Sequence, residues 1–227
     1  MKTQTELGGK KIRVWDLPTR VFHWSIVVLF IFSWVSAEIG GTAMQYHLWS
    51  GYAMLSLVIF RVLWGVVGSE TTRFAHFVRG PRTVMTHTRA FFKAGYQSTA
   101  LGHNALGGWS VLAMLFALAL QTTTGLFAND DLTTEGPLYH LVSKATSDLI
   151  SEIHSSAFYV LLALVVMHIS AIVFYRVVHR ENLLTPMLTG DKVVPQGTPA
   201  LRQASVWLAL VLALAAGGAV YWIVTKL

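Results

Sequence analysis

The chain has 227 residues, of which 54% are hydrophobic and 12% are charged, and its formal net charge is +6. A soluble domain usually carries about twice this fraction of charged residues, so the composition excludes an ordinary soluble protein and favours helices that face lipid. The chain contains no cysteine, which excludes disulfides, iron–sulfur clusters, thiolate zinc sites and covalently attached c-type haem.

Five apolar windows are long enough to cross a bilayer, whose hydrocarbon core of ~30 Å needs about 20 helical residues. In chain order, these windows cover residues 21–39, 47–68, 104–127, 153–175 and 205–225. They are joined by a short turn near residue 40 and by the polar segments 69–103, 128–152 and 176–204. We therefore predict an all-α integral membrane helical bundle that forms a single domain over residues 1–227.

The first window also has features of a secretory signal, because a basic lead precedes it and Val35-Ser36-Ala37 resembles a cleavage site. The polar lead is long for such a signal. We expect an uncleaved first helix.

The basic residues are distributed unequally between the two ends of the predicted helices. Fifteen of the 17 Lys and Arg residues fall on one side, counting Arg61 near the end of the second helix, and only Lys144 and Lys226 fall on the other. Basic loops stay in the cytoplasm. We therefore expect a cytoplasmic N-terminus and an outer C-terminus. The net charge is explained by topology and contact with membrane lipid, and we expect no nucleic acid partner.

Four histidines lie in or at the edge of predicted helices, where ionisable side chains are costly and mark function: His23, His47, His154 and His168. His154 and His168 are fourteen residues apart on one helix, nearly four turns, so they share a face and lie about 21 Å apart along the axis. The alternating helix directions place His23 at the depth of His168, and His47 at the depth of His154. Two facing pairs predict two bis-imidazole haem sites in the bundle core.

Two alternatives stay open for these histidines. They could lie at the membrane interface, bonded to backbone or lipid headgroups. A zinc site is a weaker alternative, because four histidines divided between two depths make two incomplete sites. His140 is also fourteen residues from His154, but a polar stretch, 143–148, separates the two. We expect His140 in an outer loop.

Three further residues fit haem binding. Gly51 follows His47 by one turn, and its missing side chain would let a flat macrocycle approach the backbone, although helix packing explains a glycine equally well. Arg20 precedes His23 by three residues, and Arg61 follows His47 by fourteen. Both arginines are expected near the cytoplasmic haem, where they could pair with propionates or extend to lipid headgroups.

These motifs resemble a known family. Arg20-Val21-Phe22-His23-Trp24 is similar to the R-x-x-H-W opening of the cytochrome b subunits of nickel–iron hydrogenases and formate dehydrogenases. Tyr46-His47 with Gly51, and the spacing of His154 and His168, resemble the bacterial di-haem cytochrome b561 group. The likeness covers nearly the whole chain.

The resemblance implies two non-covalent haems b in a core of helices 1–4, with a fifth, peripheral helix. It assigns His23 and His168 to the cytoplasmic-side iron and His47 and His154 to the outer-side iron. It also implies a multi-pass protein of the bacterial inner (plasma) membrane. The simplest members stop after four helices, so the fifth window is a departure.

Two histidines on each iron leave no open position, which favours outer-sphere electron transfer. We predict transfer between a peripheral or periplasmic redox protein and membrane quinone, as the electron-transfer component of a quinone-linked oxidoreductase. The resemblance favours a quinone site near the cytoplasmic haem, with His103, Arg79 and Arg82 as candidates. Two alternatives remain: a self-sufficient membrane oxidoreductase that oxidises superoxide or another small reductant, and a non-redox metal-binding membrane protein.

Overall fold

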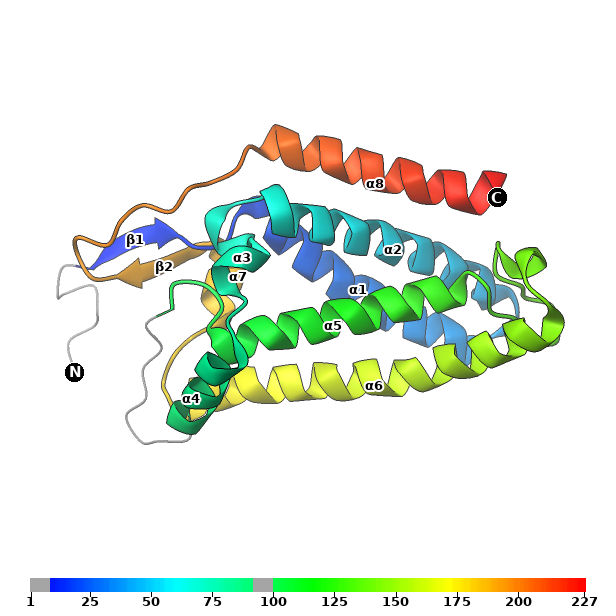
Figure 1. Ribbon diagram of the computed structural model, residues 1–227, viewed down its shortest axis with the longest axis horizontal. Helices are drawn as coiled ribbons and strands as arrows, with labels where there is room; N and C mark the ends of the chain where they lie inside the picture. The colour runs from blue at the N-terminus through cyan, green and yellow to red at the C-terminus, as the bar shows by residue number, and fades with distance from the viewer. Residues whose placement is uncertain (1–8, 92–99) are drawn as a thin grey trace. The chain divides into compact units, whose positions relative to one another are not determined.

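The structure is a computed structural model and describes residues 9–91 and 100–227. Lys2 and Lys93 lie outside the described residues. Five long helices dominate the fold (Figure 1). They are α1 (Leu17–Ile39), α2 (Met44–Val67), α5 (Ala105–Gly125), α6 (Lys144–Val177) and α8 (Val206–Lys226). All five are long and apolar enough to cross a membrane, which confirms the predicted all-α membrane architecture.

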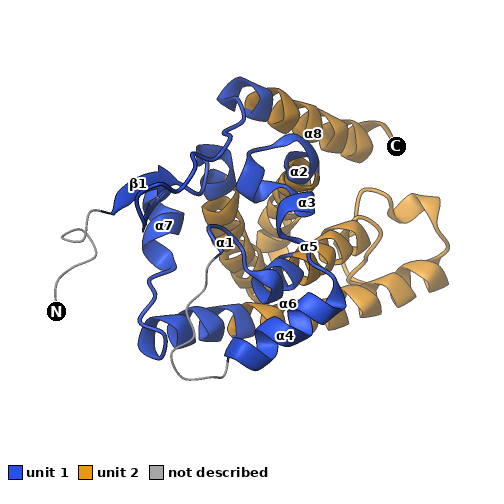
Figure 2. Ribbon diagram, turned by 60° about the vertical axis from the view of Figure 1, so that its left-hand side comes forward, with its two compact units in different colours: residues 1–21, 63–111, 167–209 blue, residues 22–62, 112–166, 210–227 orange. Residues whose placement is uncertain are grey.

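Contacts divide the chain into two compact units (Figure 2). Unit 1 comprises Met1–Val21, Leu63–Val111 and Met167–Ala209, and unit 2 comprises Phe22–Val62, Leu112–Val166 and Leu210–Leu227. Each long helix contributes one end to unit 1 and the remainder to unit 2.

A small two-stranded sheet lies in unit 1. Strand β1 (Lys10–Arg13) pairs antiparallel with β2 (Asp191–Val194), which follows the short helix α7 (Leu184–Thr189). Gly190 ends α7 with a φ of 92°, and its carbonyl accepts the backbone N–H groups of Val14 and Trp15. A Cβ at this position would lie 2.8 Å from the Trp15 carbonyl oxygen. Both the left-handed backbone and the close contact therefore require glycine.

Helix α1 begins four residues before the apolar window because Asp16 caps it. One Asp16 oxygen accepts the Thr19 backbone N–H at 2.8 Å, as an N-cap does. The other accepts the indole N–H of Trp64 at 3.0 Å. Asp16 is 4% exposed and Trp64 is fully buried. Hydrogen bonding, which a hydropathy window does not measure, therefore sets this helix start.

The predicted polar segment 69–103 contains structure that the sequence analysis did not identify. It forms the 3₁₀ turn η3 (Glu70–Thr72), α3 (Phe74–Phe77) and α4 (Pro81–Phe91). Phe91 at the end of α4 contacts Phe174, Tyr175 and His179, with ring centroids 4.9, 5.2 and 5.2 Å away. Phe91 thus packs α4, a largely polar helix, against the end of α6. A single buried aromatic residue is too weak a pattern to predict this helix from the sequence.

The core of unit 2 brings four helices together. Val58 of α2, Leu118 of α5 and Leu161 of α6 form one buried cluster, against which Ile26 and Phe30 of α1 pack. A second cluster includes Val220, through which α8 packs against Leu55, Leu126 and Leu138.

Helix α6 begins at Lys144, so the predicted boundary at residue 153 was wrong, and residues 144–152 are helical rather than part of a loop. The Ser143 hydroxyl accepts the Thr146 backbone N–H at 3.2 Å and caps the helix. Ser147 is fully buried and donates to the Phe127 carbonyl at 2.7 Å. These first turns are polar because they bond to the preceding loop. His140 lies in the short turn η4 (Tyr139–Leu141), outside the spans as expected.

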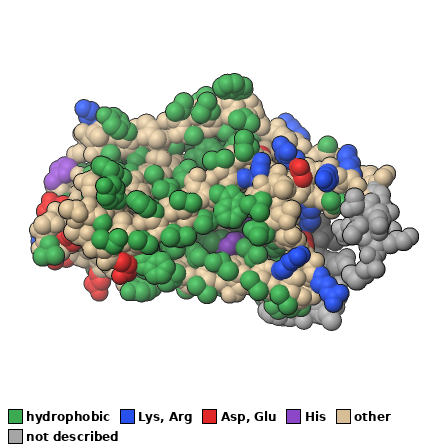
Figure 3. Space-filling view, turned by 180° about the vertical axis from the view of Figure 1, so that it is seen from behind, with side chains coloured by type: hydrophobic (Ala, Val, Ile, Leu, Met, Phe, Trp, Pro, Cys, Tyr) green, Lys and Arg blue, Asp and Glu red, His purple; other side chains and the backbone are tan. Residues whose placement is uncertain are grey.

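Large hydrophobic side chains are exposed in both units, such as Trp207 in unit 1 and Phe116 in unit 2. Figure 3 shows hydrophobic side chains over the middle of one face, with charged groups gathered toward its ends. Unit 1 holds most of the described basic residues, and unit 2 holds most of the described acidic residues. The described basic residues of unit 1 are Lys10, Lys11, Arg13, Arg20, Arg73, Arg79, Arg82, Arg89, Arg176, Arg180, Lys192 and Arg202. The described acidic residues of unit 2 are Glu38, Asp130, Asp131, Glu135, Asp148 and Glu152.

Candidate functional site

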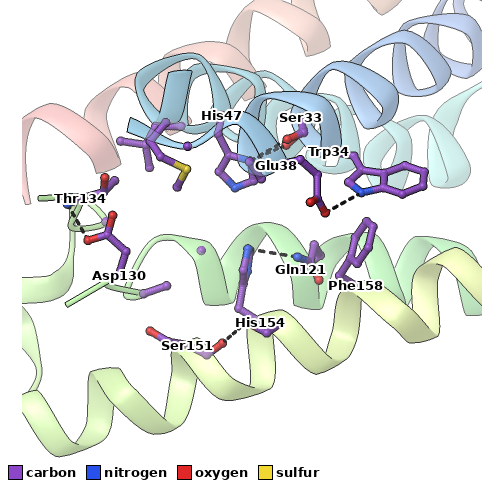
Figure 4. A pocket seen from close by; sticks show the side chains of 18 of the residues that line it. Ser33, Trp34, Glu38, His47, Gln121, Asp130, Thr134, Ser151, His154 and Phe158 are labelled. Carbon is purple, nitrogen blue, oxygen red and sulfur yellow. Dashed lines mark hydrogen bonds between the residues drawn. The ribbon is translucent and has the colours of Figure 1, made fainter. Parts of the chain in front are cut away.

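Unit 2 contains a cavity of about 560 Å³ that is lined by α1, α2, α5, α6 and the loop after α5. His47 enters it from α2 and His154 from α6, and the two rings point toward one another (Figure 4). Their centroids are 6.2 Å apart and their planes are nearly perpendicular, at 84°. The structure therefore brings this predicted pair together.

His47 is oriented by Ser33 of α1. Its Nδ1 lies 2.9 Å from the Ser33 carbonyl oxygen and 3.1 Å from the Ser33 hydroxyl. A carbonyl oxygen only accepts, so Nδ1 carries the proton. The lone pair of neutral His47 is then on Nε2, the nitrogen that is left for a metal.

Residues of α5 orient His154 so that its proton also lies on Nδ1. Its Nδ1 lies 3.1 Å from the Thr124 hydroxyl oxygen, and that hydroxyl donates its own proton to the Leu120 carbonyl at 2.7 Å. The Thr124 oxygen must therefore accept from Nδ1–H, which leaves the lone pair on Nε2. Gly125 allows the close approach, since a Cβ there would lie 3.0 Å from His154 Cε1.

Gln121 of α5 also lines the cavity, next to His154. Its amide nitrogen lies 3.1 Å from Nε2 of His154. Its Oε1 is buried and has no hydrogen-bond partner among the described residues. A buried polar atom usually has a partner, so this oxygen indicates a cavity built to receive another group.

The residues present fit a haem. A first-row metal binds an imidazole nitrogen at about 2 Å, so two rings on one metal have centroids about 6 Å apart, which agrees with the 6.2 Å observed here. A Cβ on Gly51 would have no atom within 4 Å, but Gly51 does not line the cavity, so its contact with a haem stays a prediction. Among the described residues, no three His, Cys, Asp or Glu side chains come together. A tetrahedral zinc site therefore lacks ligands here.

The second predicted pair is divided between the units. His23 lies in the part of α1 that belongs to unit 2, with its ring 5.0 Å from that of Trp24. His168 lies in the part of α6 that belongs to unit 1. Their pairing stays a prediction.

The two predicted arginines have different surroundings. Arg20 donates from Nη1 to the Leu188 carbonyl at 2.6 Å, at the C-terminal end of α7, where a cation is favourable. Arg61 is 3% exposed within α2. Their contacts with haem propionates stay predictions.

The candidate quinone residues all lie in unit 1. The His103 ring is 4.7 Å from that of Trp15 and 5.1 Å from that of Phe77. Arg79 and Arg82 are exposed, and the Arg79 carbonyl accepts the Trp109 indole N–H at 2.8 Å. These contacts explain the packing of His103, and the quinone role of the three residues stays a prediction.

Sequence reasoning missed Ser33, Gln121 and Thr124 as parts of the site. The signal available was the spacing of Gln121, Thr124 and Gly125, which puts the three on one face of a helix. That spacing predicts that the three residues share one face of the helix, but it does not predict which helix packs against that face.

A comparison with family models identifies the family of the chain. A family model described as prokaryotic cytochrome b561 matches residues 14–190. Comparisons with curated proteins and with solved structures give no match. The matched range contains all four predicted histidine ligands and most of the chain. The chain therefore belongs to the prokaryotic cytochrome b561 family, whose members bind haem b and transfer electrons in bacterial membranes.

Proposed function

We propose that this b-type cytochrome holds two haems, each between two histidines, and transfers electrons between a redox partner protein and membrane quinone. The observation that carries the proposal is the His47–His154 pair, with the Nδ1 atoms bonded to Ser33 and Thr124 and the rings 6.2 Å apart. His23 and His168 are proposed as the second pair, which rests on their spacing and on the family resemblance.

The protein groups would hold and orient the haem. His47 and His154 would bind it through Nε2, while the Ser33 carbonyl and the Thr124 hydroxyl fix the ring orientations and would make the ligands more basic. The bound haem supplies an iron that takes up and releases one electron. With two histidines as its ligands, the iron would have no position open to a substrate, which would favour electron transfer over chemistry at the metal. Phe30, Leu118 and Leu161 give the cavity an apolar lining.

The test is the molar ratio of haem to polypeptide in detergent-purified protein, measured by the alkaline-pyridine assay and amino-acid analysis. We expect about two haems per chain and a low-spin spectrum. His154→Ala and His168→Ala should each lower the ratio. His140→Ala is the matched control, because His140 lies in a turn where its Nε2 contacts the Leu227 backbone oxygen.

A ratio near one would contradict one of the two pairs, and a ratio near zero in haem-replete cells would overturn the proposal. A second assay tests the partner. If the purified chain alone in quinone-containing vesicles transfers electrons from a small reductant to quinone, the protein is a self-sufficient oxidoreductase. If it requires a partner protein, it is the membrane component that we propose.

A further inference from the structure

The charges in the wall of the His47–His154 cavity are negative. Glu38 at the end of α1 and Asp130 in the loop after α5 both line it, as Figure 4 shows. Among the described residues, no Lys or Arg contributes to this lining. The other polar lining groups are hydroxyls, amides, the Trp34 indole and the two histidines.

Hydrogen bonds hold both carboxylates in place. Glu38 accepts the Trp34 indole N–H at 3.1 Å. Asp130 Oδ1 accepts the backbone N–H groups of Thr134, Leu132 and Thr133 at 2.8, 2.9 and 2.9 Å. These bonds, that of Thr134 above all, lower the pKa of Asp130 to about 2. Asp130 is therefore a fixed negative charge at neutral pH.

The described cations of unit 2 do not offset these charges. Lys144 forms ion pairs with both Asp131 and Asp148. Arg61 follows His47 by fourteen residues on α2, which places it about 21 Å along the helix axis. Lys226 is the last residue of α8 and does not line the cavity.

We propose that Glu38 and Asp130 lower the reduction potential of the haem held by His47 and His154. The inference rests on the proposed function, because it requires a haem between these two residues. Reduction adds one negative charge to the site, and a neighbouring carboxylate makes that addition less favourable. Both carboxylates line the cavity that the two histidines enter. Both are also exposed, so solvent and salt screen their Coulomb interaction with the haem but do not abolish it.

The test is a spectroscopic redox titration of purified protein that carries its haems, for wild type, Asp130→Asn and Glu38→Gln. The haem-to-chain ratio of each sample is measured first. We expect one of the two haem components to titrate at a higher potential in each variant, while the other is unchanged. At a fixed potential, the ferrous-to-ferric ratio of the affected haem should rise about two- to tenfold.

Two controls separate charge from structure. Asp130→Glu retains the charge, so its titration should match that of the wild type. Glu152→Gln removes an exposed carboxylate from α6 that does not line the cavity, and it should leave both potentials unchanged. With two haems bound, unmoved potentials in Asp130→Asn and Glu38→Gln, or equal shifts of both haems, overturn this inference alone. A wild-type ratio that shows no haem at this pair overturns the proposed function as well.

Discussion

At the scale of single residues, the hydrogen-bond partners of Nδ1 determine which nitrogen of each histidine is left for a metal. The Ser33 carbonyl accepts the Nδ1 proton of His47. The Thr124 hydroxyl donates its own proton to the Leu120 carbonyl, so its oxygen accepts the Nδ1 proton of His154. Such partners usually strengthen metal binding because they hold the ring and its tautomer. Thr124 therefore belongs to the site as a positioning residue, although it does not contact the ligand group.

Replacing Thr124 should weaken the haem site that we propose for His47 and His154. Thr124→Val removes the acceptor of the His154 Nδ1 proton, so we expect roughly 10- to 100-fold weaker haem binding at this site, measured by haem transfer to an apo-acceptor protein. Thr124→Ser should restore binding. Thr123→Val is the control, since the Thr123 hydroxyl is exposed and bonds only to its own helix. Equal haem loss in the Thr123 and Thr124 variants would contradict the role of Thr124.

Asp16 is a residue whose importance is structural. Asp16→Ala should destabilise the fold by about 2–4 kcal/mol, because it removes a helix cap and leaves the buried Trp64 indole N–H without its acceptor. Thermal unfolding in detergent measures the loss. Asp191→Ala, which removes a half-exposed ion pair with Arg13, should cost less than about 1 kcal/mol. Similar losses in both variants would show that Asp16 does not act through these bonds.

At the scale of elements, the loop after α5 and the first turns of α6 form one bonded structure. Buried Ser147 donates to the Phe127 carbonyl and accepts from the Asn129 amide at 2.6 Å. Gly136 fits beneath this loop, where a Cβ would lie 2.4 Å from the Leu126 carbonyl oxygen. The loop thus has a defined shape, which keeps Asp130 and Thr134 in the cavity wall.

The Asp130 turn should persist to unusually low pH. Its pKa of about 2 in the fold lies below the usual value of about 4. The ionised carboxylate therefore stabilises the turn fully above about pH 4, and this contribution is lost as the pH falls through 2. In nitrogen-15 NMR spectra of the detergent-solubilised protein, the Thr134 amide signal should titrate with a midpoint near 2. A midpoint near 4 would show that the backbone bonds do not form. Asp130→Asn should abolish the titration.

At the scale of the whole molecule, charge determines how the helices insert. The described segments before α1, between α2 and α5, and between α6 and α8 contain most of the Lys and Arg residues. If these segments stay in the cytoplasm, as basic loops do, the N-terminus is also cytoplasmic. An odd number of spans then places the C-terminus outside. The five helices are consistent with this arrangement.

Reporter fusions test this topology. Alkaline phosphatase fused after Leu227 should be active and green fluorescent protein at the same place should be dark, because the C-terminus is expected outside. Fusions after Gly80, between α2 and α5, should give the opposite result. Fluorescence of the Leu227 fusion would reverse the predicted orientation.

The sequence alone was sufficient for the five spans, because about 20 consecutive apolar residues have few stable arrangements other than a membrane helix. It was insufficient for the ends of those helices. Asp16 and Ser143 extend α1 and α6 beyond their apolar windows by capping. The β1–β2 pairing joins residues about 180 positions apart, and four-residue strands have too little periodicity to be identified individually.

For the site, the sequence by itself predicted histidine ligands and a depth for each of them, since membrane insertion makes a buried histidine costly and helix geometry relates spacing to height. Only the tertiary structure decided that His47 and His154 face each other and that Ser33 and Thr124 hold their tautomers. It also placed Glu38 and Asp130 in the same cavity. The physical reason is that helical periodicity specifies a face, whereas the neighbour of that face depends on how all the helices pack together.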